Sequence, residues 1–198
     1  QKFIELLTPE QKSVSLANPI SADMSEMRTT LWAGLLKTAM YNLNRQQNRI
    51  RIFETGLAFT TLNGLEQTPR IAGLICGPVT EENWFGKAQS ADFFDIKGDV
   101  EALLNLTGGA GQYSFEAGSH PALHTGQTAV VKKAGQAIGF VGALHPLVQK
   151  NLDIQSKVYL FELVLAPVQA GILPRFKELS KYPEVRRDLA VIVDEKIS

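Results

Sequence analysis

Two stretches of the chain carry apolar side chains at helical spacing. In the first, every fourth position is apolar and further apolar residues lie beside these positions: Leu31, Leu35, Ala39 and Leu43, with Trp32, Leu36 and Met40. Such a stripe predicts a helix that packs on a core, and Thr29 or Thr30 is suited to cap its start. The second predicted helix begins at Asp95, has Ile96, Val100, Leu103 and Leu104 on one side, and is ended by Gly108-Gly109.

The other apolar segments are short and bounded by turn residues, which predicts strands. The expected elements are strands at residues 51–61 (interrupted at Gly56), 70–76, 113–116 and 158–165, a hairpin of 128–132 with 136–144 around Ala134-Gly135, and a short helix at 146–152. We expect Trp84 and Phe85 to form an aromatic plug at the core edge. Because hairpins dominate and no steady βα alternation occurs, the fold class is predicted to be α+β, a mostly antiparallel sheet with flanking helices.

The C-terminal part of the chain changes character. A boundary is expected at residues 171–174, and the polar stretch 177–183 is typical of a linker. Residues 189–193 are β-rich, yet a lone strand cannot stabilise itself. We therefore expect one domain at residues 1–175, and at 176–198 a linker followed by the first strand of a truncated second domain. Residues 184–198 are expected to be poorly ordered or to pair with a neighbouring molecule.

Charge and hydropathy narrow the class of protein. Lys plus Arg total 20 and Asp plus Glu total 20, so the formal net charge is zero. A protein that binds nucleic acid over its whole surface usually has more basic than acidic residues, so any RNA contact of this chain should be local. No apolar run approaches the roughly 20 residues of a membrane span, and no signal peptide opens the chain. We expect a cytoplasmic protein without membrane contact.

Histidine and cysteine are sparse. His120 and His124 are separated by four positions, but Pro121 between them argues against a helix that presents both to a metal ion. His145 precedes a proline, and we interpret all three histidines as turn or capping residues rather than metal ligands. Cys76 lies in an apolar run, which predicts a buried strand residue rather than a reactive thiol.

Other clusters also have structural interpretations. Four acidic residues stand near the start of the second predicted helix: Asp92, Asp95, Asp99 and Glu101. They complement the helix dipole, and we favour a helix cap over a metal site. The basic stretch with Arg45, Arg49 and Arg51 lacks interleaved aromatic residues, which favours a solvated helix end over an RNA patch. Gly-rich phosphate-binding loops and G-x-S-x-G elbows do not occur.

A series of short runs occurs in a fixed order along residues 18–194. They are residues 18–21 (N-P-I-S), 23–31 (D-M-S-E-M-R-T-T-L), 34–36 (G-L-L), 42–45 (N-L-N-R), 52–56 (I-F-E-T-G), 94–98 (F-D-I-K-G), 120–121 (H-P), 139–146 (G-F-V-G-A-L-H-P), 159–163 (Y-L-F-E-L), 180–183 (S-K-Y-P) and 186–190 (R-R-D-L-A). Taken in this order, the runs resemble the β chain of bacterial phenylalanyl-tRNA synthetase.

The resemblance implies a domain folded like a class II synthetase core, followed by the start of a ferredoxin-like anticodon-binding domain. In that family the α chain holds the active core, and the β copy helps to hold two α and two β chains together. ATP and magnesium are implied for the whole enzyme, and no cofactor for this fragment. The α chain and tRNA are the implied partners. Candidate α-chain contacts are Arg28, Asn44, Arg45 and Glu54, and candidate RNA contacts are Arg186 and Arg187.

Active class II cores place an arginine that neutralises the ATP α-phosphate just after a strand such as 52–56. Here Phe59 is followed by Thr60, Thr61 and Leu62, and residues 158–165 lack the Gly-rich partner that carries a second arginine. We therefore predict no catalytic, cofactor-binding or metal-binding residue, and a chain that supports phenylalanine attachment by packing against the α chain. A tRNA-binding module is the alternative. An independent ligase is disfavoured, and editing belongs to a β-chain domain absent here.

Overall fold

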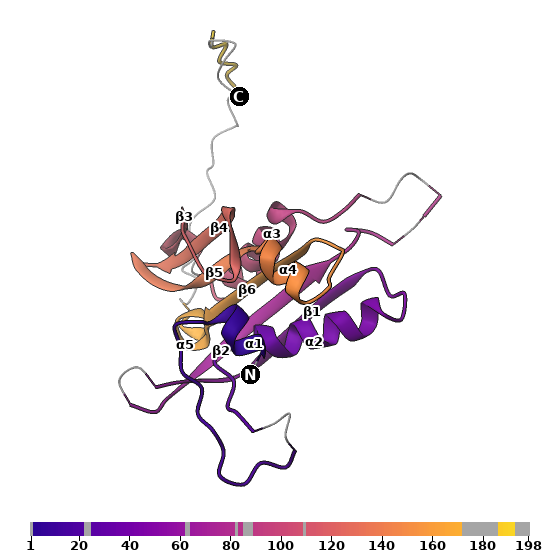
Figure 1. Cartoon of the computed structure of the whole chain (residues 1–198). Coiled ribbons are helices and arrows are strands. Elements are labelled where there is room, and N and C mark those ends of the chain that lie inside the picture. The colour runs from indigo at the N-terminus through magenta and orange to yellow at the C-terminus, as the bar shows by residue number, and fades with distance from the viewer. Residues whose placement is uncertain are drawn as a thin grey trace.

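The computed structural model describes residues 2–21, 25–61, 64–81, 83–84, 89–108, 110–171 and 186–192. Its centre is a six-stranded antiparallel sheet with the order β1-β2-β6-β5-β4-β3 (Figure 1). The strands are β1 (Ile50–Thr60), β2 (Glu66–Cys76), β3 (Tyr113–Ala117), β4 (Leu123–Lys133), β5 (Gln136–Leu144) and β6 (Val158–Val164). The predicted α+β class with an antiparallel sheet and flanking helices is confirmed.

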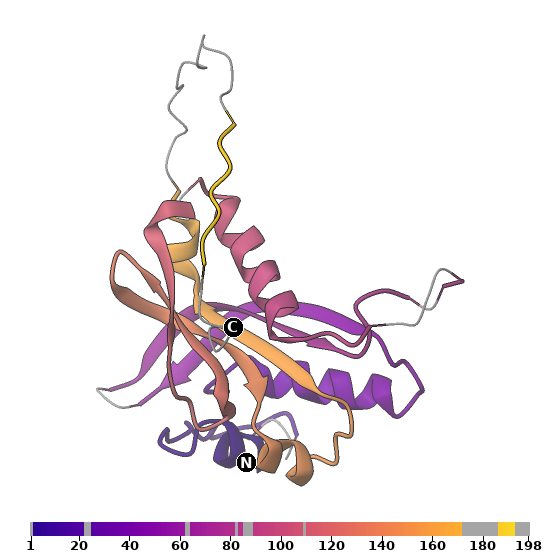
Figure 2. The same ribbon diagram turned by 90° about the horizontal axis from the view of Figure 1, so that it is seen from above.

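Helices cover both faces of this sheet, as the view from above shows (Figure 2). On one face, α2 (Trp32–Leu43) packs with α1 (Lys2–Leu7) and α4 (Pro146–Asn151) in one apolar cluster. On the other face, α3 (Phe93–Asn105) and α5 (Leu165–Gln169) pack in a second cluster. The strand β6 lies between β2 and β5 and is buried at its first six positions, which explains its almost continuous apolar sequence.

The helix α2 forms as its apolar spacing predicts. Trp32, Leu35, Leu36 and Ala39 are buried, and Leu43 packs against the same cluster. Thr30 has a capping role one position before the structural N-cap: its hydroxyl oxygen accepts a hydrogen bond of 3.1 Å from the Trp32 backbone N–H. The core-facing stripe is therefore confirmed. The predicted threonine cap is displaced by one residue, because the N-cap is Leu31 and Thr30 accepts from the first helical N–H.

The helix α3 begins at Phe93, two residues before the predicted start. The Asp92 carboxylate accepts from the backbone N–H groups of Phe94 and Asp95, and the Asp95 carboxylate accepts from the Asp92 N–H, which is a complete capping box. The helix-cap interpretation is confirmed for Asp92 and Asp95, whereas Asp99 pairs with Arg51 and Glu101 with Lys97. Beyond the helix, Gly108 takes a positive φ of 72°, as expected for a residue that ends a helix.

The hairpin of β4 and β5 also agrees with the sequence. Ala134 and Gly135 both have positive φ, 48° and 81°, which matches the right-handed twist of the flanking strands. After β5, Pro146 occupies the first turn of α4 and the His145 side chain accepts the Leu147 N–H. A short 3-10 helix, η2 (Ala110–Gln112), precedes β3.

The N-terminal residues form α1, an element that the sequence did not predict, and it packs on α2 as part of the core. Two expectations differ from the structure. Gly56 does not interrupt β1, which pairs with β2 without a register shift. Trp84 is 88% exposed, because backbone pairing of residues 77–79 with 89–91 carries the loop beyond the end of the sheet. The expectation for the C-terminal stretch is not contradicted: residues 186–192 have no regular secondary structure and pair with no described strand.

The predicted linker at 177–183 and most of the predicted boundary lie outside the described residues, and the division at residue 175 stays a prediction. Among the described helices, none has the length and apolar character needed to cross a membrane.

Candidate functional site

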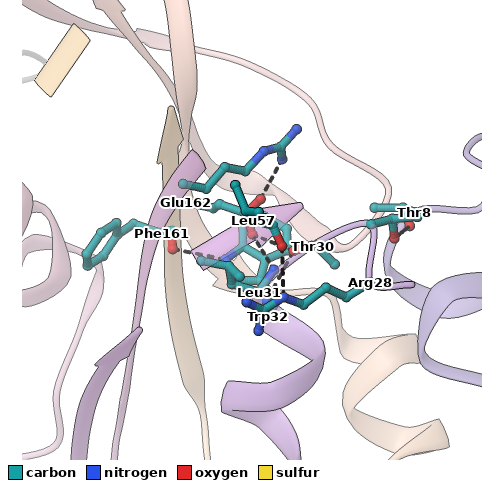
Figure 3. Close-up of polar contacts among 10 residues, drawn as sticks. Thr8, Arg28, Thr30, Leu31, Trp32, Leu57, Phe161 and Glu162 are labelled. Carbon is teal, nitrogen blue, oxygen red and sulfur yellow. Dashed lines mark hydrogen bonds and ion pairs between the residues drawn. The ribbon is translucent and has the colours of Figure 1, made fainter. Parts of the chain in front are cut away.

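Arg28 connects the segment before α2 to β1, where it contacts Leu57 (Figure 3). The Arg28 Nε donates to the Leu57 carbonyl oxygen at 2.8 Å, and its Nη1 forms an ion pair with Glu54. The Arg28 carbonyl accepts the Phe59 N–H at 2.9 Å. Arg28 and Glu54, two of the predicted α-chain contacts, are thus brought together along β1, with about a third or more of each side chain exposed.

A second polar cluster is buried beside the first, around Glu162 on β6 (Figure 3). Its carboxylate accepts from the Thr30 hydroxyl and, at 3.0 Å, from the Leu31 backbone N–H, and it pairs with the Arg70 guanidinium on β2. Glu162 is only 6% exposed. A buried charge is tolerated when it is paired and hydrogen-bonded, and the negative charge also lies at the start of α2, where the helix dipole favours it.

Trp32, the first residue of α2, hydrogen-bonds the start of this helix to β6. Its indole Nε1–H donates to the Phe161 carbonyl at 2.9 Å, and Trp32 is 2% exposed. Glu162, Arg70 and Trp32 were not predicted as site residues. One signal was available for Glu162: it is the single charged residue in the apolar run 158–165, and an acid on a buried strand must find a partner.

The other two predicted α-chain contacts lie at the opposite end of α2. Asn44 is the C-cap residue, and its backbone N–H donates to the Met40 carbonyl. The Arg45 guanidinium lies 3.4 Å from the centre of the Tyr41 ring and donates to the Tyr41 carbonyl. The four candidates therefore form two separate pairs rather than one surface.

The predicted RNA contacts Arg186 and Arg187 are both exposed, in a stretch without regular secondary structure. Of the other basic residues, Arg49 donates to the Val79 carbonyl and Arg51 pairs with Asp99 on α3. The guanidinium groups of Arg49 and Arg51 are thus engaged within the fold.

All three histidines make the same turn contact. The Nδ1 atoms of His120, His124 and His145 accept backbone N–H groups two residues ahead, at 3.1, 3.0 and 3.2 Å. Their interpretation as turn and capping residues is confirmed. Within the described part of the chain, no group of three or more His, Cys, Asp or Glu side chains is placed to hold a metal ion.

His120 borders a polar cavity of about 250 Å³ that Gln11, Arg70 and Glu162 also line. Its ring makes edge contacts with Trp32 and Phe140, each with ring centres 5.0 Å apart. Burial, and then the nearby Arg70 charge, lower the pKa of His120 to about 4. The Gln11 Oε1 and the Arg70 Nε are buried without a hydrogen-bond partner among the described residues, so the cavity offers an acceptor and a donor to a small polar molecule or solvent.

Cys76 is 2% exposed on β2, as expected of a buried strand residue. Burial raises the pKa of its thiol above the ordinary value, although a hydrogen bond with Ser156 opposes the shift. Because the thiolate is the nucleophile, this environment favours an unreactive cysteine.

β1 ends in Thr60, at the position where the resemblance places the arginine of an active class II core. The next residue, Thr61, donates its hydroxyl to the Lys12 carbonyl. Neither side chain carries the positive charge that a phosphate requires.

The sequence profile that describes the phenylalanyl-tRNA synthetase β-chain CLM domain matches residues 1–165. Relatives named phenylalanine–tRNA ligase β subunit include those of Hahella chejuensis, 54% identical over 197 residues, and of Pseudomonas syringae pv. tomato, 52% identical over 198 residues. The matches cover 99% and 100% of this chain but 25% of each relative. The chain thus spans a quarter of the length of these relatives.

Among solved structures, a pyrrolysyl-tRNA synthetase from Desulfitobacterium hafniense is similar with a TM-score of 0.58 and 16% identity, over 83% of this chain and 53% of that one. A second structure from the same organism gives a TM-score of 0.50 and 14% identity over 75% of this chain and 50% of that chain. At this identity the likeness concerns the fold alone, a class II synthetase-like arrangement of an antiparallel sheet with flanking helices. By the profile and by its relatives, the chain belongs to the phenylalanyl-tRNA synthetase β-chain family.

Proposed function

We propose that this chain is a non-catalytic part of phenylalanine–tRNA ligase that packs against the catalytic α chain. In the whole enzyme it would support the ATP- and magnesium-dependent attachment of phenylalanine to tRNA. The observation that carries the proposal is the pairing of charges at the start of α2. Arg28 is held by Glu54, and Arg70 by Glu162, so these guanidinium groups stabilise the fold instead of facing a phosphate.

The end of β1 supports the same proposal. Stabilising an adenylation transition state needs fixed positive charge at the α-phosphate, and Thr60 and Thr61 are neutral. A domain of this fold without that charge can still hold a partner in place, because packing requires only a complementary surface.

Two measurements test the proposal. The purified chain should show no phenylalanine-dependent pyrophosphate exchange, and it should form a stable complex with isolated α chain in size-exclusion chromatography with light scattering. Exchange activity without the α chain would contradict the non-catalytic part of the proposal. The absence of a complex at micromolar concentrations of both chains would contradict the packing part.

A tRNA-binding module is the second candidate, favoured by the exposed Arg186-Arg187 pair. The zero net charge of the chain weighs against it. Binding of tRNA that weakens steeply with salt and is lost in Arg186→Ala/Arg187→Ala would favour it, because phosphate contacts release counterions.

A further inference from the structure

The cavity of about 250 Å³ beside the start of α2 is lined by polar and by apolar side chains. The strands β5 and β6 supply apolar ones, among them the half-buried Phe140 and Val164. One water molecule needs only roughly 10–15 Å³ of such space, whereas pockets for drug-sized ligands have roughly 300–1,000 Å³. The cavity therefore matches a molecule smaller than a typical drug, of about one ring.

The charges in the lining cancel. Glu162 pairs through Oε1 with Nη1 of Arg70. Its Oε2 accepts from the Thr30 hydroxyl and the Leu31 N–H (Figure 3), so both carboxylate oxygens are engaged. His120 is neutral at pH 7, because burial and the Arg70 charge lower its pKa to about 4. A charged ligand would bring an unbalanced charge into a largely buried site, which costs free energy, so the lining favours an uncharged one.

Three polar atoms of the lining residues are left for a ligand. The Gln11 Oε1 is an acceptor and the Arg70 Nε a donor, and both are buried without a partner among the described residues. The His120 Nδ1 accepts the Ala122 N–H, so the proton of the neutral ring is on Nε2. That Nε2–H is a second donor, and none of the described residues accepts from it. A complementary ligand presents an acceptor to the two N–H groups and a donor to the Gln11 oxygen.

We propose that this cavity binds a small uncharged molecule with an amide or lactam group, whose carbonyl oxygen accepts from Arg70 and His120 and whose N–H donates to Gln11. An amide has an acceptor and a donor on adjacent atoms and carries no charge. A ketone lacks the donor, and carboxylates and amines are charged at neutral pH. The apolar remainder of the ligand packs against Phe140 and Val164. The proposal does not depend on packing against the α chain.

Ligand-detected NMR titration of the whole enzyme that contains this chain tests the proposal with two probes. The first, 2-piperidone, is a one-ring lactam, and the second, cyclohexanone, has the same size and a carbonyl but no N–H. The lactam should bind about tenfold more tightly or better, because only the lactam satisfies the buried Gln11 oxygen. The substitution Gln11→Met keeps the length of the side chain and removes the acceptor, so it should raise the dissociation constant of the lactam to that of cyclohexanone. The matched control Gln67→Met, at an exposed position of β2, should leave it unchanged.

A crystal structure of the enzyme soaked with 2-piperidone provides the location. The carbonyl oxygen of the lactam should lie within about 3.2 Å of the Arg70 Nε. Equal affinities of the two probes for the wild-type enzyme would overturn the proposal, and this comparison holds even where Gln11→Met lowers the stability of the fold. Lactam binding that Gln11→Met does not weaken, or that occurs outside the cavity, would overturn it too. The absence of saturable binding would do the same and assign the cavity to ordered water.

Discussion

A Cβ atom at Gly56 would lie 2.1 Å from Nη2 of Arg28. The missing side chain at position 56 is therefore what lets the guanidinium lie across β1 and reach both Leu57 and Glu54. The glycine that was expected to interrupt the strand instead makes room for a contact from a segment 28 residues earlier in the sequence. Glycine weakens a strand locally, but the close approach of another group is a recognised reason for its presence.

Replacing Gly56 with alanine should displace the Arg28 side chain. The expected cost is about 1 kcal/mol of unfolding free energy, the usual value of one partly exposed charged hydrogen bond and ion pair. Urea denaturation measures it. The matched control is Gly98→Ala in α3, where a Cβ meets nothing within 4 Å and alanine should stabilise the helix by about 0.5–1 kcal/mol. If Gly56→Ala is as stabilising as Gly98→Ala, the proposed role of Gly56 is wrong.

Replacing Glu162 with glutamine should have a much larger effect. The change leaves the Arg70 guanidinium, with a side chain 23% exposed, without its counter-ion. Breaking a buried pair in this way costs about 3 kcal/mol. The control Glu116→Gln removes the exposed partner of Lys132 and should cost less than about 1 kcal/mol. Equal effects of the two substitutions on the urea midpoint would show that the buried cluster does not stabilise the fold.

The parts of the fold that were predictable are those fixed by local pattern. The stripe from Leu31 to Leu43, the turn at Ala134-Gly135 and the acidic start of α3 each depend on neighbours within a few residues, so spacing and turn chemistry suffice. The class of fold followed from the order of these elements. The helix α1 was not predictable in this way, because six residues carry little intrinsic helicity and its formation depends on packing against α2.

The candidate site was predicted only in part, for a related reason. Arg28 and Glu54 were selected from runs that resemble a family, and the structure joins them. Glu162 contacts Thr30 across 132 positions of sequence, and no periodicity within one strand reveals such a partner. The position of β6 between β2 and β5 creates the contact, so it becomes visible only once the topology is known.

Leu35→Ala tests the packing of α2. Leu35 is 4% exposed in the core cluster beneath the helix, and truncating a buried leucine costs about 2–5 kcal/mol. Thr38→Ala, at an exposed position of the same helix, should change stability by less than about 0.5 kcal/mol. A Leu35→Ala change as small as that of the control, measured by urea denaturation, would mean that the helix face is misassigned.

Acid should destabilise the fold through His120. Burial and Arg70 lower its pKa in the folded protein to about 4, whereas in the unfolded chain it is about 6.5. Between these values the unfolded state binds a proton that the folded state does not, so stability falls as the pH is lowered from about 6.5 to 4. Above pH 6.5 both states are neutral at this site and the contribution is constant.

The substitution His120→Asn isolates this contribution, because asparagine can accept the Ala122 N–H but does not titrate. Unfolding free energies of both proteins should be measured in urea at pH 7, 6, 5 and 4.5. The carboxylates affect both proteins equally. The unfolding free energy of the wild type should therefore fall more with decreasing pH than that of His120→Asn. The control His124→Asn makes the same substitution at the equivalent turn contact to Gly126. Its stability should fall with decreasing pH as much as that of the wild type, since His120 is still present. The difference in unfolding free energy between the wild type and His120→Asn could instead stay constant between pH 7 and 4.5. That result would show that burial between Trp32 and Phe140 does not lower the pKa of His120.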